Sequence, residues 1–105
     1  MTYRMFVDDV RDPEWTYPDD AEGWVVVRDY TSAVALVCQH GWPNHVSFDH
    51  DLGTGPSGYD FAHWLVQHDL EHGGMPADFS YRVHSANPIG AVNIHGLVSG
   101  YLRSR

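Results

Sequence analysis

The amino-acid sequence predicts a single α/β domain built on a parallel sheet. Short apolar runs alternate with longer segments in which apolar residues recur at helical spacing, a pattern typical of parallel strands connected by helices. Such a sheet is expected to be covered on both faces. The 105 residues suffice for one layered core but not for two, so residues 1–105 are predicted to form one domain.

Four short apolar runs have the composition of strands, and they occupy residues 3–7, 24–29, 45–49 and 79–84. Each run leads into polar or charged residues at its C-terminal end. The loop 11–23, between the first two strands, contains Pro13 and Pro18 and shows no helical period. We therefore expect no helix in this loop.

Three helices are predicted over residues 31–39, over residues 57–72 and from residue 87 almost to the C-terminus. The first is expected to begin near Asp29 or Thr31. The second opens on a serine followed three residues later by Asp60, which is the spacing of a capping box, and it stops at a pair of glycines. The third opens on Asn87-Pro88, which is typical of an N-cap followed by a first helical residue.

The charge of the chain excludes several classes of function. Six basic residues stand against fourteen acidic ones, and the formal net charge of −8 opposes binding along an extended nucleic-acid backbone. All six basic residues are arginines. Because the sequence contains no lysine, a site with a lysine Schiff base, a lysine nucleophile or a P-loop is excluded.

The cellular location is predicted from what the sequence lacks. Cys38 is the single cysteine, so a disulfide within the chain and a cysteine zinc cluster are excluded. No segment has the length and apolar character of a membrane span, and the N-terminal residues do not resemble a signal peptide. We expect a cytoplasmic protein without membrane contact, and the sequence gives no indication of its oligomeric state.

Reactive side chains follow three of the four predicted strands. They are Asp8 and Asp9 after the first, Asp49, His50 and Asp51 after the third, and His84, Ser85 and Asn87 after the fourth. The carboxyl ends of parallel strands meet at one edge of the sheet, so these side chains are expected to line a ligand crevice there. Carboxylates at positions 8, 9 and 49 are ligands of the kind that Mg²⁺ or Mn²⁺ prefers.

Two histidines and one arginine beside these acids suit chemistry on a phosphate. His50 and His84 are able to transfer protons near neutral pH and are the candidate catalytic groups together with Asp49. Arg11 either clamps a phosphate or forms a surface ion pair with Asp12 or Asp9.

Other candidates also have a structural interpretation. Asp51 either contributes to the site or satisfies backbone amides in its own turn, and Asn87 is an N-cap, a substrate ligand or both. Trp15 and Tyr17 lie in the loop expected above the crevice and are candidates for stacking on a nucleobase. The remaining histidines are interpreted as surface or partly buried groups without a ligand role; they are His40, His45, His63, His68, His72 and His95.

The acids at 8, 9 and 49, together with Ser85-Ala86, resemble the active site of response-regulator receiver domains. The resemblance implies a flavodoxin-like three-layer sandwich, truncated here to about four parallel strands in order 2-1-3-4 and about three helices. It also implies that the three acids and the carbonyl of Asp51 bind a divalent metal, while Ser85 contacts a phosphoryl group. Receivers also carry a lysine after a fifth strand, and this sequence has neither, so we rank a phosphoacceptor role for Asp49 last.

A closer resemblance is to cyclic-phosphate processing receiver domains, which occur in phages and in bacterial conflict and RNA-repair systems. The similar stretches are FVDDVRDP, SFDHDLG, SGYD and VHSANPIGAVN, in that order between Met5 and Asn93. The resemblance implies activity on a cyclic phosphate, with Arg11, Ser85, Asn87 and Asn93 binding the substrate.

Two classes of function therefore remain. The first is a metal-dependent phosphodiesterase that opens a 2′,3′-cyclic phosphate at an RNA end or a cyclic nucleotide signal. The second is a non-catalytic receiver-like module that sequesters a nucleotide or docks a protein partner. If His50 and His84 face one metal-lined crevice, the enzyme is favoured, because a module that only binds has less use for two proton carriers.

Overall fold

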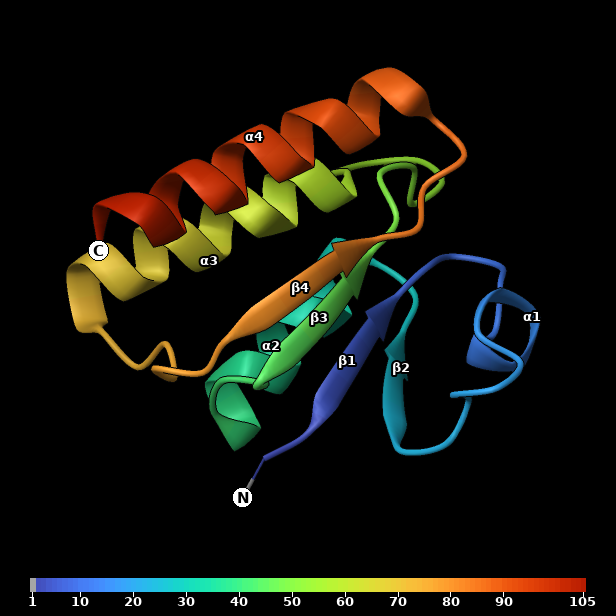
Figure 1. Cartoon of the computed structure of the whole chain (residues 1–105), viewed down its shortest axis with the longest axis horizontal. Helices are drawn as coiled ribbons and strands as arrows, with labels where there is room; N and C mark the ends of the chain where they lie inside the picture. The colour runs from blue at the N-terminus through green and yellow to red at the C-terminus, as the bar shows by residue number, and fades with distance from the viewer. Residues whose placement is uncertain (1) are drawn as a thin grey trace.

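A computed structural model of the chain describes residues 2–105 and confirms the predicted sheet. Its four strands are β1 (Arg4–Val7), β2 (Trp24–Val27), β3 (His45–Phe48) and β4 (Ser80–Val83). All strand pairs are parallel and the order is β2-β1-β3-β4, as expected for a truncated receiver (Figure 1).

The three long helices are α2 (Tyr30–His40), α3 (Gly58–His72) and α4 (Pro88–Ser104). Asp29 rather than Thr31 caps α2, since its carboxylate accepts a hydrogen bond from the backbone amide of Ser32. The capping box at Ser57 and Asp60 is present. The N-cap role of Asn87 is confirmed as well, since its side-chain oxygen accepts from the amide of Gly90.

All three long helices pack on one face of the sheet, and α3 lies between α2 and α4. Alternate strand residues, such as Met5, Val7, Val46 and Phe48, point toward these helices and form one apolar core with them. The core is continuous, and it holds the strands against α3 and α4.

The opposite face of the sheet is covered by the loop 11–23 instead of a long helix. This loop contains one helical turn, α1 (Pro13–Thr16), so the expectation of no helix in the loop was wrong for these four residues. Pro13 is suited to the first helical position because its fixed φ matches the helix and its missing amide is not needed there. The third layer of the predicted sandwich is thus a loop with a single turn.

Aromatic and charged contacts fasten this loop to the sheet. The Tyr17 ring stacks on Trp24 with centroids 5.6 Å apart, and both rings meet Phe6 edge-on. The carboxylate of Asp20 lies 2.8 Å from the guanidinium of Arg4 and 3.6 Å from that of Arg82. One acidic residue of the loop therefore connects to the first and last strands of the sheet.

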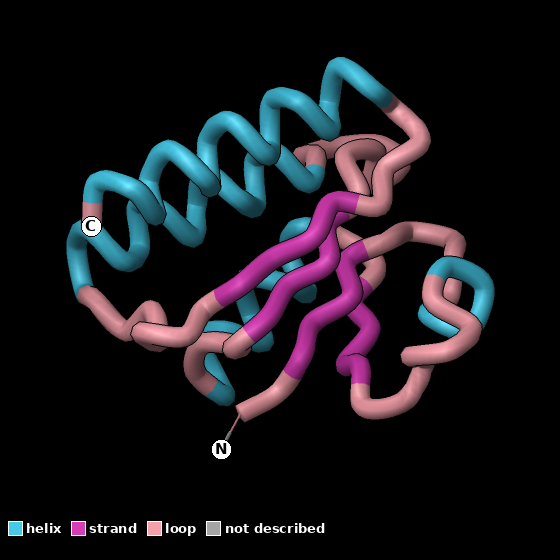
Figure 2. Tube along the Cα trace, in the orientation of Figure 1, coloured by secondary structure: helices cyan, strands magenta, loops and turns pink. Residues whose placement is uncertain are grey.

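The segments that follow β1, β3 and β4 gather at the same edge of the sheet, which is where Figure 2 shows the loops at the strand C-terminal ends. This edge carries the candidate site. Within residues 2–105, the helices are all too short or too polar to cross a membrane.

Candidate functional site

Three carboxylates meet at the carboxyl edge of the sheet. One oxygen from each of Asp8, Asp9 and Asp49 lies within 4.8 Å of the others. The first two follow β1 and the third follows β3, so the parallel pairing of these strands places the acids together. The sequence-based expectation that these three residues share a site agrees with this geometry.

Asp8 is fully buried and its carboxylate has three hydrogen-bond donors. Its Oδ1 accepts from the backbone amides of Val10 and Arg11 at 2.9 and 2.7 Å, and its Oδ2 accepts from Nε2 of His84 at 2.9 Å. Burial raises the pKa of Asp8, but the two amides and His84 outweigh it and hold this pKa below its ordinary value. Asp8 is therefore a permanent negative charge at the site.

The pKa of Asp49 is shifted in the opposite direction. Burial, followed by the nearby charge of Asp8, raises the pKa of Asp49, while the hydroxyl of Ser85 and the amide of His50 act against this rise. Two buried carboxylates that repel one another are stabilised by a cation between them. Hard divalent cations prefer carboxylate oxygens, so this set of donors fits Mg²⁺ or Mn²⁺.

Glycines allow the neighbouring segments to approach these acids. A Cβ atom at Gly58 would lie 1.7 Å from the carbonyl oxygen of Asp49, so only glycine lets α3 begin so close to the end of β3. Gly53 has a φ of +75°, and a side chain there would start 3.7 Å from Oδ2 of Asp9. The loop after β3 thus passes directly beside the acid cluster.

His84 lies under the acid cluster and away from solvent. Its side chain is 3% exposed, and both ring nitrogens are occupied, Nε2 by Asp8 and Nδ1 by Oγ of Ser47 at 2.7 Å. The ring of Phe6 stacks on it with centroids 4.5 Å apart. Burial lowers the pKa of His84, although the carboxylates of Asp8 and Asp49 act in the other direction.

His50 lies on the other face of the sheet, against the start of α4. A Cβ atom at Gly90 would lie 2.3 Å from the His50 ring, so the ring is packed on the backbone of this helix. The Nδ1 atom of His50 lies 3.0 Å from Oδ1 of Asp51. His50 and His84 therefore do not share one crevice, the arrangement that would have favoured an enzyme with two proton carriers.

The side chain of Asp51 lies outside the acid cluster. Its second oxygen is 3.5 Å from Nδ2 of Asn87, so Asp51 connects His50 to the start of α4 instead of satisfying amides of its own turn. A groove of about 640 Å³ adjoins this connection, and it is lined by His50, Ser57, Tyr59, Val92, Asn93, Gly96 and Leu97. Asn93 thus faces the same groove as His50.

Arg11 approaches the cluster from the loop after β1. Its guanidinium donates to the carbonyl oxygen of His84 at 3.2 Å. The surface pair considered for Arg11 is made by Arg28 instead, which contacts Oδ1 of Asp12 at 2.5 Å and also donates to the carbonyl oxygen of Asp8. Arg28 therefore holds the loop that carries the acidic pair, and Arg11 is not held by a carboxylate among the described residues.

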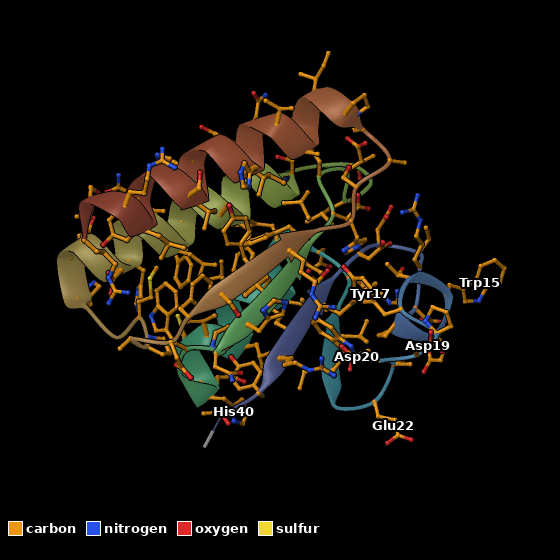
Figure 3. All side chains as sticks on the ribbon, in the orientation of Figure 1. Trp15, Tyr17, Asp19, Asp20, Glu22 and His40 are labelled. Carbon is orange, nitrogen blue, oxygen red and sulfur yellow. The ribbon has the colours of Figure 1, made fainter. Side chains whose placement is uncertain are left out.

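The two aromatic residues predicted to lie above the crevice differ in position (Figure 3). Trp15 projects from α1 into solvent and is 84% exposed, whereas Tyr17 points back onto the sheet. The Tyr17 hydroxyl lies 2.8 Å from Oγ of Ser47. Tyr17 is thus engaged within the fold, and a stacking role stays a prediction for Trp15 alone.

The sequence did not indicate Ser47 or Arg28 as contributors to this site, and it indicated Tyr17 only for stacking on a nucleobase, not for a contact with Ser47. Ser47 interrupts an otherwise apolar strand, and a polar residue at a buried strand position requires a hydrogen-bond partner, which is the feature that would have drawn attention to it. The partners of Tyr17 and Arg28 lie far along the chain, so spacing alone carries no information about them.

Comparisons with known proteins now bear on this geometry. Searches of curated proteins and of solved structures returned no match. The family model described as the cyclic-phosphate processing receiver domain matches residues 3–100, nearly the whole chain. Together with the strand order and the acids at the sheet edge, this match confirms the resemblance seen in the sequence. The chain belongs to the family of cyclic-phosphate processing receiver domains.

Proposed function

We propose that this protein is a metal-dependent hydrolase that opens a cyclic phosphate, either a 2′,3′-cyclic phosphate at an RNA end or a cyclic nucleotide. The observation that carries the proposal is the group of three carboxylates within 4.8 Å of one another, placed at the ligand-binding edge of a domain of this family. Their number and chemistry suit a divalent cation, and the family is described by the processing of cyclic phosphates.

Asp8, Asp9 and Asp49 would hold the cation, together with the backbone carbonyl of Asp51. When bound, Mg²⁺ or Mn²⁺ neutralises phosphate oxygens and lowers the pKa of a bound water. Asp8 remains ionised because of its three donors, and it therefore keeps the site ready for a cation across the physiological pH range.

Arg11, Ser85 and Asn87 would bind the phosphate. Arg11 supplies a guanidinium able to pair with two phosphate oxygens, and Ser85 lies beside Asp49. Asn87 opens α4, a helix of 17 residues whose first amides favour an anion. Arg11 follows β1, whereas Ser85 and Asn87 follow β4, and the Arg11 guanidinium donates to the carbonyl oxygen of the neighbouring His84.

His50 is the group that we assign to proton transfer. Its Nδ1 is oriented by the carboxylate of Asp51, which leaves Nε2 to donate a proton to the leaving oxygen. The side chain of His50 is 23% exposed, whereas the buried ring of His84 has no free nitrogen. We assign His84 to the support of Asp8 instead.

The groove beside His50 would take the nucleoside part of the substrate. Tyr59 offers an aromatic surface there and the Asn93 amide offers both a donor and an acceptor. The net charge of −8 disfavours a long strand, so a mononucleotide, a small cyclic nucleotide or an RNA terminus is preferred.

One observation favours the second candidate function, a module that binds a nucleotide or a protein without turnover. His50 and His84 lie on opposite faces of the sheet, so only one histidine is available to a substrate at the acid cluster. A binding module needs no proton carrier, and the acids with Arg11 would still hold a metal-bound phosphate.

A turnover assay separates the two. The panel contains 2′,3′-cyclic and 3′,5′-cyclic mononucleotides, cyclic dinucleotides and RNA with a 2′,3′-cyclic end, each with Mg²⁺ or Mn²⁺ and again with chelator. Opening of one substrate that stops with chelator supports the hydrolase. Retention of a nucleotide without any product overturns the hydrolase and supports the module.

A further inference from the structure

A continuous line of hydrogen bonds connects the loop 11–23 to the acid cluster along the face of the sheet that this loop covers. The Tyr17 hydroxyl lies 2.8 Å from Oγ of Ser47, this oxygen lies 2.7 Å from Nδ1 of His84, and Nε2 of His84 lies 2.9 Å from Oδ2 of Asp8. Ser47 and Asp8 are fully buried, and the His84 side chain is 3% exposed. The line therefore crosses the interior of the protein without solvent between its members.

The chemistry of these groups determines which atom donates in each hydrogen bond of the line. An ionised Asp8 only accepts, so Nε2 of His84 carries the proton and donates it. In a neutral imidazole Nδ1 is then an acceptor, and the Ser47 hydroxyl must donate to it. Because Ser47 has one proton, the Tyr17 hydroxyl donates to the Ser47 oxygen. Every donor in the line points toward Asp8.

Packing holds the imidazole ring in one orientation. Phe6 stacks on the ring at an interplanar angle of 10°, and Tyr17 meets it edge-on with centroids 6.3 Å apart. The ring is thus confined between two aromatic side chains and bonded at both nitrogens. A histidine held in this way fixes the direction in which Oδ2 of Asp8 presents its remaining lone pair.

We propose that Tyr17, Ser47 and His84 are positioning residues that hold the Asp8 carboxylate in the orientation a divalent cation requires. The inference rests on the metal site of the proposed function and assigns to it a supporting group that comes from the sheet face covered by the loop 11–23. Groups that orient a ligand carboxylate typically change metal affinity by about 10- to 100-fold when they are removed.

Loss of the Ser47 hydroxyl has a specific consequence for His84. Without a donor at Nδ1, the imidazole keeps its proton on Nε2, because the Asp8 carboxylate is then the partner that remains. The ring is held at one nitrogen alone, so it orients Oδ2 of Asp8 less firmly. The loss is therefore visible in the ¹⁵N shift of Nδ1, which no longer accepts a hydrogen bond, and in the affinity for a cation.

The experiment compares Ser47→Ala with Ser80→Ala in the full chain. Ser80 is a matched control, because its hydroxyl also contacts Nδ1 of a histidine on this sheet, His45 at 2.6 Å, and this pair lies at the other end of the strands. The dissociation constant for Mn²⁺ alone is measured by titration calorimetry, and the ¹⁵N shifts of the imidazoles report the tautomers.

We expect wild type to show His84 with its proton on Nε2. We expect Ser47→Ala to bind Mn²⁺ about tenfold more weakly and to shift the ¹⁵N signal of His84 Nδ1 while Nε2 keeps its proton, and Ser80→Ala to match wild type in both. Equal Mn²⁺ affinity in wild type and Ser47→Ala would overturn the positioning role while leaving the metal site in place. Absence of Mn²⁺ binding by wild type would overturn both the metal site and the positioning role.

A second variant covers the case in which Ser47→Ala does not fold. Tyr17→Phe removes only the outermost donor and keeps the ring that packs on the sheet, so we expect about a threefold loss of Mn²⁺ affinity. Unchanged affinity in this variant would remove Tyr17 from the positioning group. An Nδ1-protonated His84 in wild type would overturn the direction of the whole line.

Discussion

Asp8 and Asp49 are neighbours whose pKa values are shifted in opposite directions. Asp8 is surrounded by three donors, which hold its pKa low in spite of its burial. Asp49 is also buried but lies next to the Asp8 charge, and its pKa is raised. At the scale of single residues, the charge of Asp8 therefore opposes ionisation of Asp49, and a cation between them would relieve this repulsion.

Asp49→Asn is predicted to have opposite effects on stability and on metal binding. Removal of one of two repelling charges should stabilise the metal-free protein by on the order of 1 kcal/mol. The same change should abolish binding of Mn²⁺ and any turnover. Thermal denaturation with and without Mn²⁺ measures both effects, and Asp19→Asn, an exposed acid outside the site, should match wild type. Retained Mn²⁺ binding would remove Asp49 from the ligands.

His50→Ala is predicted to affect turnover without affecting the metal. If Nε2 of His50 gives the proton to the leaving oxygen, kcat should fall by about 10²- to 10⁴-fold while the Mn²⁺ dissociation constant is unchanged. His84→Ala should instead weaken Mn²⁺ binding, since it leaves Oδ2 of Asp8 without its donor. A change confined to KM in His50→Ala would make His50 a binding group.

At the scale of elements, the start of α4 determines where His50 lies. Gly90 is in the first turn of this helix and is buried against the His50 ring. Alanine is the better helix former by about 1 kcal/mol, but the close contact with the His50 ring leaves no room for its methyl group here. The backbone of α4 thus serves as one wall of the His50 pocket.

Gly90→Ala is predicted to displace His50 while the acid cluster stays intact. The added methyl would lie 2.3 Å from the ring, so turnover should fall at least tenfold with little change in Mn²⁺ affinity. Gly100→Ala is the matched control, because a Cβ there meets only a guanidinium nitrogen of Arg103 at 4.0 Å. That variant should be stabilised by about 0.5–1 kcal/mol. Full activity of Gly90→Ala would detach His50 from the chemistry.

Asp69 joins the C-terminal ends of α3 and α4. Its carboxylate accepts from the Tyr101 hydroxyl at 2.6 Å and from the Met75 amide at 3.0 Å, and Arg105 lies 3.7 Å away. Burial raises the pKa of Asp69, but these three groups outweigh it and the pKa lies below its ordinary value. The contact therefore depends on an ionised carboxylate.

Acid is predicted to weaken this contact. A group whose pKa is lowered on folding stabilises the protein above its unfolded pKa, about 3.9 for aspartate, and this stabilisation is lost as pH falls through the folded pKa. Asp69→Asn should cost roughly 2 kcal/mol at pH 7. The difference from wild type in denaturant unfolding should shrink below about pH 4. A difference that stays constant down to pH 2 would show that ionisation of Asp69 does not contribute.

At the scale of the whole molecule, a cation at the acid cluster would join the segments that follow β1 and β3. Mn²⁺ at 100 times its dissociation constant should stabilise the fold by about 2.7 kcal/mol. For a domain of this size, that corresponds to a rise in Tm of roughly 10–20 °C. Chelator should reverse the rise, and Ca²⁺, which prefers more ligands at longer distances, should produce a smaller one. An equal Tm with and without Mn²⁺ would contradict the metal site.

Much of this architecture could be predicted from the sequence, because the responsible forces are local. The strands follow from short apolar runs, and the caps at Asp29, Ser57 and Asn87 follow from hydrogen bonds within three residues. The acids at 8, 9 and 49 were expected to meet because parallel strands end at one edge.

What could not be predicted depends on contacts between distant segments. The direction of the His50 ring is set by a glycine of α4, and the burial of His84 is set by Phe6 and Tyr17. Residues adjacent in a strand point to opposite faces, but the sequence alone does not show which face a long helix covers. For this reason the sequence left open whether both histidines face one crevice.

The bond between His84 and Asp8 joins residues 76 positions apart, and this separation has a consequence for the protein while it is being made. Asp8 leaves the ribosome first, and it acquires the partner that orients it only after nearly all of the domain has been translated. A nascent or clipped chain therefore displays the N-terminal acids without the bond that orients Asp8. On the proposed function, ion capture would mark a completed domain, and a pulse of Mn²⁺ during refolding would report a late step of folding.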